Sequence, residues 1–269
     1  GASLMSQLII GVLEPASYVS YNLLALLCCA TLIPLTLTKV AQPETPKAPR
    51  LRPMLAISRS PLAAVGVVVA ALSGASFRMT GPIFGQQVGL EITTIAYFLA
   101  SFVLGGAIAQ YPIGFIADKI DRRWVLIWLS FAAIISCMVT ANINTNNTYI
   151  LMLTAGIFGF TTFPIFSVAA AHAHDFAQDY ERVELSAALM FFYAVGAIAA
   201  PYTASILMQS FGPSALFYLI AFGHVGLVVF GFYRMLSRPS VEEKTDYIYS
   251  PRTSFLIGRL LKSHHKDHK

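Results

Sequence analysis

Charge is scarce in this sequence of 269 residues, of which 12% are charged and 56% are hydrophobic. A soluble domain carries about 25% charged residues, whereas the mean hydropathy of this chain is +0.66. The composition excludes a soluble enzyme, a disordered chain and a secreted domain held together by disulfides. It indicates a protein that crosses a lipid bilayer several times.

Motifs of enzymes and metal sites are also missing. The three cysteines, Cys28, Cys29 and Cys137, lie in apolar runs without the spacing of metal ligands, which favours small buried residues. There is no P-loop, dinucleotide-binding glycine string, G-x-S-x-G or H-E-x-x-H. His172 and His174 could ligate a metal or respond to pH, but residues two apart do not share a helix face, which favours a polar cap. We therefore expect no enzyme, no cofactor and no metal.

Long apolar runs are what the sequence has instead. A membrane-spanning helix needs about 17 to 25 apolar residues, and seven runs qualify: residues 21–37, 62–84, 92–117, 124–141, 149–171, 185–208 and 215–233. Residues 4–13 form a run too short to cross, which we interpret as the end of a further helix rather than a signal peptide. Runs without alternation predict helices, so we expect an all-α integral membrane protein.

The cationic residues orient these spans. Of the 18 Lys and Arg residues, 17 lie in alternate loops and in the tail, all on one side of the membrane. The positive-inside rule makes that side cytoplasmic, which predicts a multi-pass protein of the cell membrane, the inner membrane in a bacterium, with a cytoplasmic C-terminus. The net charge of +5 then reflects topology and contact with anionic membrane lipid, so a nucleic-acid partner is not needed.

One cation, Arg78, lies inside a span, whereas none of the 13 acidic residues lies in the middle of one. An arginine at membrane depth marks a site that faces a cavity. Alternatively, it reaches the outer interface, helped by a helix break at Gly81 and Pro82. The sequence leaves both alternatives open.

The last six spans contain an internal echo. Residues 106–112 read GAIAQYP in the second of these spans, and residues 196–201 read GAIAAP in the fifth. Related strings three helices apart, on antiparallel helices, fit a 3+3 inverted repeat. The alternative is a chance match among residues that are common in membranes.

The loop after the second of these spans carries the most specific motif. Its glycine and charged residues are Gly114, Asp118, Lys119, Asp121, Arg122 and Arg123. Gly114 would let two helices approach closely, and Asp118 would face the N-terminus of the helix that begins near Leu185. The cations could pair with the acidic residues of the motif or of a later loop, which are Asp175, Asp179, Glu181 and Glu184. The alternative is a loop of solvated charges.

The motif resembles the signature G-x-x-x-D-[R/K]-x-G-x-[R/K]-[R/K] of the major facilitator superfamily, in the copy between the eighth and ninth helices. Asp121 stands where the signature has glycine, and the basic pair arrives one position early. The surrounding sequence is similar to the bacterial branch that includes the YcaD-like group. The resemblance implies a six-helix bundle with a 3+3 inverted repeat, preceded by about one and a half further helices.

The same resemblance divides the chain into four parts. Residues 1–37 would be the end of the fifth helix and the sixth helix of an N-terminal half, and residues 38–60 the central cytoplasmic linker. Residues 61–233 would be the C-terminal six-helix domain, and residues 234–269 a cytoplasmic basic tail. Facilitators hold their substrate between two halves. The missing N-terminal half would come from the same longer chain, a separate chain or a second copy.

As a function, the resemblance implies the C-terminal portion of a secondary transporter that moves a small solute by alternating access. Gly114, Asp118, Lys119, Arg122 and Arg123 would form a cytoplasmic latch that breaks when the cavity opens inward. The rival interpretation is a non-transporting membrane subunit, a degenerate half that serves interaction or assembly.

Arg78, Gln110 and Tyr193 are the residues that we expect to contact a substrate, because polar groups among apolar walls suit a small-molecule site. Arg78 would pair with an anionic group of the substrate or with a carboxylate of the other half, and Gln110 and Tyr193 would donate or accept hydrogen bonds. Other candidates, of which the aromatic members favour packing, are Gln86, Gln87, Tyr97, Tyr111, Phe158, Thr161, Thr162, Phe191 and Phe192.

Overall fold

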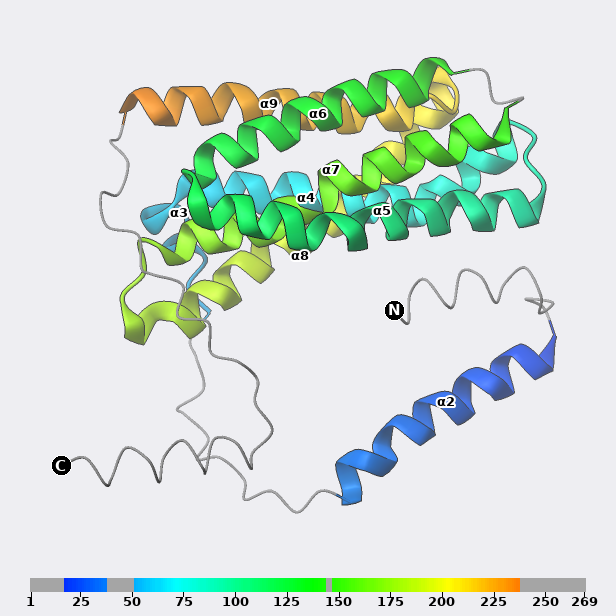
Figure 1. The fold of residues 1–269 in the computed structure, drawn as a ribbon, viewed down its shortest axis with the longest axis horizontal. Helices are drawn as coiled ribbons and strands as arrows, with labels where there is room; N and C mark the ends of the chain where they lie inside the picture. Colours follow the sequence, from blue (N-terminus) through cyan, green and yellow to red (C-terminus); the bar gives the residue numbers. More distant parts are fainter. Residues whose placement is uncertain (1–16, 38–50, 144–146, 238–269) are drawn as a thin grey trace.

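The computed structural model describes residues 17–37, 51–143 and 147–237. Six helices in these ranges are long and apolar enough to cross a membrane, and they pack into one bundle (Figure 1). They are α4 (Pro61–Gln87), α5 (Ile92–Lys119), α6 (Arg122–Asn142), α7 (Thr148–His174), α8 (Arg182–Phe211) and α9 (Ala215–Ser237). The described part of the chain contains no strand, so the predicted all-α membrane bundle is confirmed.

Helix α2 (Tyr18–Leu37) precedes the bundle. Its apolar stretch, Tyr18–Pro34, is shorter than the six spans, so the seventh span stays a prediction. Cys28 and Cys29 are exposed on α2, against expectation, whereas Cys137 is buried in the bundle as expected. The short run at residues 4–13, most of the expected linker (38–50) and the tail from residue 238 onward lie outside the described residues.

A short helix, α3 (Pro53–Arg59), lies where the sequence predicts only a linker. Pro53 takes the first helical position, where its missing N–H is not needed. Two ion pairs then hold α3 against the start of α8: Arg52 with Glu184 at 3.3 Å, and Arg59 with Glu181 at 2.6 Å. Because these partners lie more than 100 residues away, the local composition gave no sign of α3.

Proline interrupts none of the spans. Pro82, Pro112, Pro164 and Pro201 lie inside α4, α5, α7 and α8. The predicted helix break just beyond Arg78 is therefore wrong, because α4 continues through Pro82. Membrane helices accept proline because side chains, neighbouring helices and small local adjustments satisfy the freed backbone groups.

The helix contacts follow a two-fold pattern. The contact between α4 and α8 corresponds to the contact between α7 and α5. In the same way, the contact between α6 and α7 corresponds to the contact between α9 and α4. Exchanging the first three helices of the bundle for the last three leaves this set of neighbours unchanged, which a 3+3 inverted repeat requires. The echoed glycines lie at equivalent interfaces, with Gly106 of α5 against Phe163 of α7 and Gly196 of α8 against Ala71 of α4.

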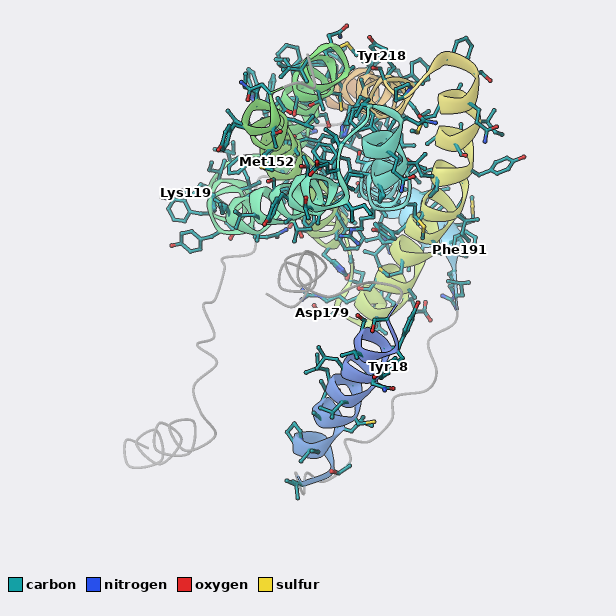
Figure 2. All side chains as sticks on the ribbon, turned by 90° about the vertical axis from the view of Figure 1, so that its right-hand side faces the viewer. Tyr18, Lys119, Met152, Asp179, Phe191 and Tyr218 are labelled. Atoms are coloured by element: carbon teal, nitrogen blue, oxygen red, sulfur yellow. The ribbon has the colours of Figure 1, made fainter. Side chains whose placement is uncertain are left out.

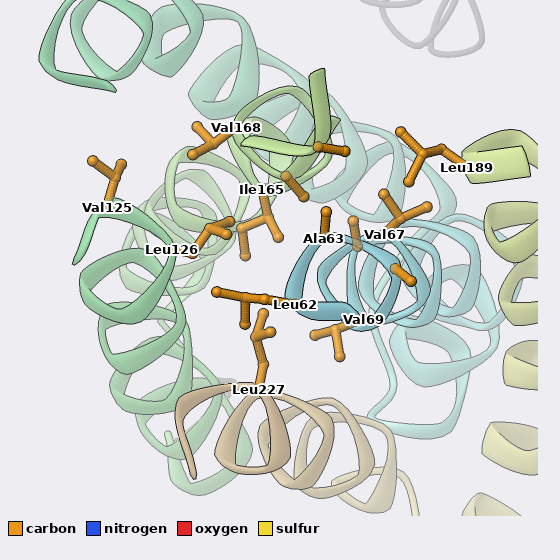
Figure 3. Packing of buried hydrophobic residues seen from close by; sticks show 14 of the residues in the cluster. Leu62, Ala63, Val67, Val69, Val125, Leu126, Ile165, Val168, Leu189 and Leu227 are labelled. Carbon is orange, nitrogen blue, oxygen red and sulfur yellow. The ribbon is translucent and has the colours of Figure 1, made fainter. Parts of the chain in front are cut away.

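Two buried clusters fill the bundle. In the first, aliphatic residues from helices α3 to α9 converge, among them Leu62, Leu126, Ile165 and Leu227 (Figure 3). The second is aromatic, and its fully buried rings include Phe77, Phe84, Phe98, Phe102, Phe158 and Phe217. A buried hydrogen bond also joins α4 to α9, with Ser73 Oγ 2.9 Å from His224 Nε2. These contacts fix the helices around the region where the candidate site lies.

Charged side chains gather at the end of the bundle where α4, α6 and α8 begin, which we call the charged end. Among the described residues, its members are Arg52, Arg59, Asp118, Lys119, Asp121, Arg122, Arg123, Asp175, Asp179, Glu181, Arg182, Glu184 and Arg234. Two described charges lie elsewhere, Glu91 at the opposite end and Arg78 between the two ends. Figure 2, which looks along the bundle, shows Lys119 and Phe191 on its outer sides.

Candidate functional site

A cavity of about 370 Å³ lies midway along the bundle, among α4, α5, α7 and α8. It is lined by Ala70, Gly74, Arg78, Gln110, Thr162, Phe163, Phe166, Ser167, Met190 and Tyr193. The structure thus brings together the three residues that the sequence singled out as substrate contacts, Arg78, Gln110 and Tyr193, although they belong to three helices. Their role in binding stays a prediction.

Small side chains on α4 make room for the cavity. Ala70, Gly74 and Arg78 are spaced four residues apart, so they lie on one face of the helix. A Cβ on Gly74 would lie 3.9 Å from the Tyr193 hydroxyl. The ring of Tyr193 is held in turn by an edge contact with Phe166, at 5.4 Å between ring centroids. This face of α4 and the aromatic pair therefore both line the cavity.

Arg78 is an exposed residue at the cavity, and its guanidinium lies against α7. Its guanidinium carbon lies 5.5 Å from the centroid of the Phe163 ring on α7. Side chains lean toward the N-terminus of their helix, and because α4 begins at the charged end, Arg78 leans away from the opposite end. Phe163 is itself held close to α5, since a Cβ on Gly106 would come within 2.3 Å of its ring. Of the two alternatives that the sequence left open, Arg78 faces the cavity.

The wider set of candidates separates into packing and surface residues. Only Thr162 of that set lines the cavity. Phe158 is fully buried among other rings, whereas Tyr111 is 83% exposed. Sequence reasoning missed Gly74 and Phe163, because glycines and aromatic residues in an apolar run look like packing positions. The sequence signal that could have revealed this wall was the stripe of small residues on α4, spaced four residues apart, that ends at Arg78.

At the charged end, Arg122 joins three helices. Its guanidinium donates to Asp118 of α5 at 3.1 Å and also to Asp175, directly after α7. The Arg122 side chain is 18% exposed, and those of Asp118 and Asp175 are 41% and 21% exposed. Lys119 lies over the Phe115 ring, with Nζ 4.0 Å from the centroid. The contact with Asp175 is therefore the better shielded of the two ion pairs of Arg122.

Two local expectations about the loop motif are not met within the described residues. A Cβ on Gly114 would meet nothing within 4 Å, so no described helix approaches closely there. The Asp118 carboxylate bonds Arg122 instead of the first turn of α8. Glu181, which directly precedes α8, accepts from the Gln178 N–H at 3.2 Å within a short 3-10 turn (Asp179–Glu181), and its other oxygen accepts from Arg59 of α3; its side chain does not cap the first turn of α8.

Asp121, which replaces the signature glycine, is the N-cap of α6. Its carboxylate accepts from the Arg123 backbone N–H at 3.0 Å and from the Arg123 guanidinium at 2.7 Å. Its φ of −60° does not require glycine. Burial by itself would raise the pKa of Asp121, but the hydrogen bonds and charge of Arg123 outweigh burial and lower this pKa below its ordinary value.

We expect Asp121→Ala to lower the thermal unfolding midpoint of the purified protein at neutral pH, because loss of an N-cap costs about 1 kcal/mol. Since the pKa of Asp121 is lowered in the folded state, its stabilising effect exists above the ordinary aspartate pKa of about 3.9 and is lost as the pH falls through the lowered value. The midpoint difference from wild type should be constant down to about pH 4 and shrink below it. Asp179→Ala, at a side chain that is 94% exposed, is the matched control. A difference that disappears near neutral pH would contradict this assignment.

The two histidines at the end of α7 differ in their surroundings. His172 is 5% exposed, and its ring packs edge-on against Phe176. His174 Nε2 lies 3.2 Å from the Ser186 hydroxyl of α8. The expected polar cap thus fits His174, whereas His172 is a core residue. Within the described ranges, no three His, Cys, Asp or Glu side chains come together as metal ligands.

Comparison with known proteins places these features in a family. A model described as the Major Facilitator Superfamily matches residues 63–264. An uncharacterized MFS-type transporter of Enterobacter sp. (strain 638) is 27% identical over 223 residues, which cover 82% of this chain and 56% of that protein. The uncharacterized MFS-type transporter YcaD of Escherichia coli O17:K52:H18 (strain UMN026 / ExPEC) is 29% identical over 197 residues, 72% of this chain and 50% of that protein.

The YcaD protein of Salmonella heidelberg (strain SL476) is also 29% identical, over 196 residues that cover 71% of this chain and 50% of that protein. The chain therefore spans about half the length of the curated relatives that it matches. The family model covers most of the chain, including nearly the whole six-helix bundle. This chain is a multi-pass membrane protein and belongs to the Major Facilitator Superfamily.

Proposed function

We propose that this chain supplies the C-terminal six-helix half of a secondary transporter, which moves a small solute by alternating access. The observation that carries the proposal is the cavity midway along the bundle, where Arg78, Gln110 and Tyr193 meet among otherwise apolar helices. A second half closes the cavity, and it comes from the same longer polypeptide, a separate chain or a second copy of this chain. The two halves rock about the bound solute.

The charged end acts as the latch in this proposal. It faces the cytoplasm, because nearly all cationic residues belong to that side, and the C-terminus lies there too. Relatives from Enterobacter, Escherichia and Salmonella support a bacterial inner membrane. Arg122, Asp118 and Asp175 hold α5, α6 and α7 together while the cavity is closed to the cytoplasm. Opening the cavity inward breaks these ion pairs.

Access to the cavity from both sides of the membrane tests the proposal. The native membrane complex is prepared with Cys28, Cys29 and Cys137 replaced by alanine and with Gln110→Cys introduced. We expect a membrane-impermeant thiol reagent to label position 110 in right-side-out vesicles and also in inside-out vesicles. Each side reaches the same thiol because the cavity opens alternately to the two faces.

The control is Leu216→Cys, at a fully buried position of α9, which neither preparation should label. Labelling of position 110 from one side only, under every condition tried, would refute alternating access. That outcome would favour a membrane subunit that does not transport. The intact mass of the native polypeptide, measured after gentle extraction, tells whether the second half belongs to the same chain.

A further inference from the structure

We infer that the cavity binds an organic monoanion with an apolar body, such as an aromatic or medium-chain carboxylate; the inference rests on the proposed function. Arg78 is the one charged side chain among the described residues that line the cavity. Four side chains there carry neutral polar groups: Gln110, Thr162, Ser167 and Tyr193. The rest of the lining is apolar or glycine. One fixed positive charge beside a largely apolar wall matches one negative charge on a largely apolar molecule.

Arg78 has no carboxylate partner within the described part of the chain. None of the ion pairs there involves it, and its guanidinium carbon lies 5.5 Å from the centroid of the Phe163 ring. A ring face attracts a cation, but it does not neutralise the charge. Because an unpaired arginine at membrane depth is costly, the site is incomplete until an anion binds.

The opposite charge has to come from outside this chain's spans. None of the 13 acidic residues lies in the middle of an apolar run. A carboxylate on the bound molecule would accept two parallel hydrogen bonds from the guanidinium fork, which is a strong and specific arrangement. The competing source is a carboxylate of the second half, and in that case the cavity would show no preference for anions.

The walls of the cavity suit the apolar body of the anion. This half alone provides about 370 Å³, which already falls within the range of about 300–1,000 Å³ for ligand pockets. Phe163, Phe166 and Met190 offer flat or flexible apolar surface for a ring or a short chain. The Tyr193 hydroxyl faces the space above Gly74, where it can donate to an oxygen of the ligand. A multiply charged anion would leave its further charges without a partner on this wall.

Thermal stabilisation of the purified native complex tests the inference. The probes are benzoate, phenylacetate, indole-3-acetate and octanoate, each compared with its neutral amide, and benzylammonium serves as a cation. We expect at least one carboxylate to raise the unfolding midpoint. The apparent affinity derived from this shift should be about tenfold higher than that of the corresponding amide. Arg78→Gln should abolish this preference, whereas Arg78→Lys should keep part of it, because lysine retains the charge without the fork.

Arg182→Gln is the matched control, because Arg182 lies outside the cavity and pairs with the exposed Asp179. The inference fails if no carboxylate exceeds its amide, if Arg78→Gln binds carboxylates as wild type does, or if benzylammonium stabilises more than every carboxylate. This result is separable from the proposed function. If position 110 is labelled from both sides but the cavity shows no preference for anions, only the inference is refuted. If anions bind but position 110 is not labelled from both sides, only the transport proposal is refuted.

Discussion

Gly159→Ala should strongly destabilise this bundle, because the added methyl group collides with the backbone of a neighbouring helix. A Cβ at position 159 of α7 would lie 1.9 Å from the Phe102 carbonyl oxygen of α5, and one at Gly105 of α5 would lie 1.9 Å from the Gly156 carbonyl oxygen of α7. Carbon and oxygen normally approach to about 3.3 Å, so the two helices would have to move apart by more than an ångström. Backbone atoms cannot rotate aside as a side chain does.

The loss extends beyond the glycines because α5 and α7 also hold the aromatic cluster together. The Phe102 and Phe158 rings stack at 5.3 Å, and Phe77 lies 4.2 Å from Phe102, both measured between ring centroids. Separating the helices opens this contact too. Overpacking costs about 1–3 kcal/mol in ordinary cores, and we expect about 3 kcal/mol or more here, which appears as a large drop in unfolding midpoint or as loss of monodisperse protein.

A graded set of glycine variants makes this result specific. At Gly196 of α8 a Cβ would meet Ala71 Cβ of α4 at 2.9 Å, so Gly196→Ala should be milder than Gly159→Ala. At Gly226 of α9 nothing lies within 4 Å, so Gly226→Ala should be neutral or slightly stabilising, because alanine favours a helix by about 1 kcal/mol over glycine. Equal unfolding midpoints for Gly159→Ala and Gly226→Ala would contradict the close packing of α5 on α7.

The spans were predictable because a bilayer demands a single local property, a continuous apolar stretch of sufficient length. Each of the last six predicted runs lies inside one of the six helices, from residues 62–84 in α4 to residues 215–233 in α9. The helices continue past the apolar runs by a few residues where charged side chains begin. Helix α3 was missed because its stability depends on ion pairs with Glu181 and Glu184, which only the fold brings near.

The cavity was predictable only through its polar members. Arg78, Gln110 and Tyr193 stand out because polar groups are unexpected inside apolar runs. Phe163 does not stand out, although its ring faces Arg78, whereas Phe158, which was among the wider candidates, lies in the aromatic core. The expected contact at Gly114 rested on its place in a motif, but a motif does not reveal which helix, if any, lies opposite.

On the proposed function, Arg122→Gln should shift the complete assembly toward an inward-open state more than Asp118→Asn does. Arg122 pairs with both Asp118 and Asp175, so its loss removes the ion pairs that link α6 to α5 and to the end of α7. Asp118 lies four residues away and its side chain is 41% exposed, so solvent screens that pair. Asp175 is the better shielded partner, and its link to Arg122 crosses from α6 to the end of α7.

The measurement is the rate at which Gln110→Cys reacts with an impermeant thiol reagent applied from the charged end. A change of about 1.4 kcal/mol in the balance between the two states is a tenfold change in their ratio, and we expect about tenfold faster labelling for Arg122→Gln and for Asp175→Asn. Asp118→Asn should change the rate by less. Uptake should slow in the same order, while the amount of protein in the membrane stays close to that of wild type.

A charge exchange separates a latch from a merely structural ion pair. Arg122→Asp combined with Asp175→Arg restores the attraction in reverse, so the double variant should label more slowly than either single variant. Arg182→Gln, which removes an exposed pair with Asp179, should label as wild type does. If Arg122→Gln labels at the wild-type rate at equal abundance, then the Arg122 ion pairs hold the helix ends in both states alike. In that case the barrier to inward opening must lie in the contacts between the two halves.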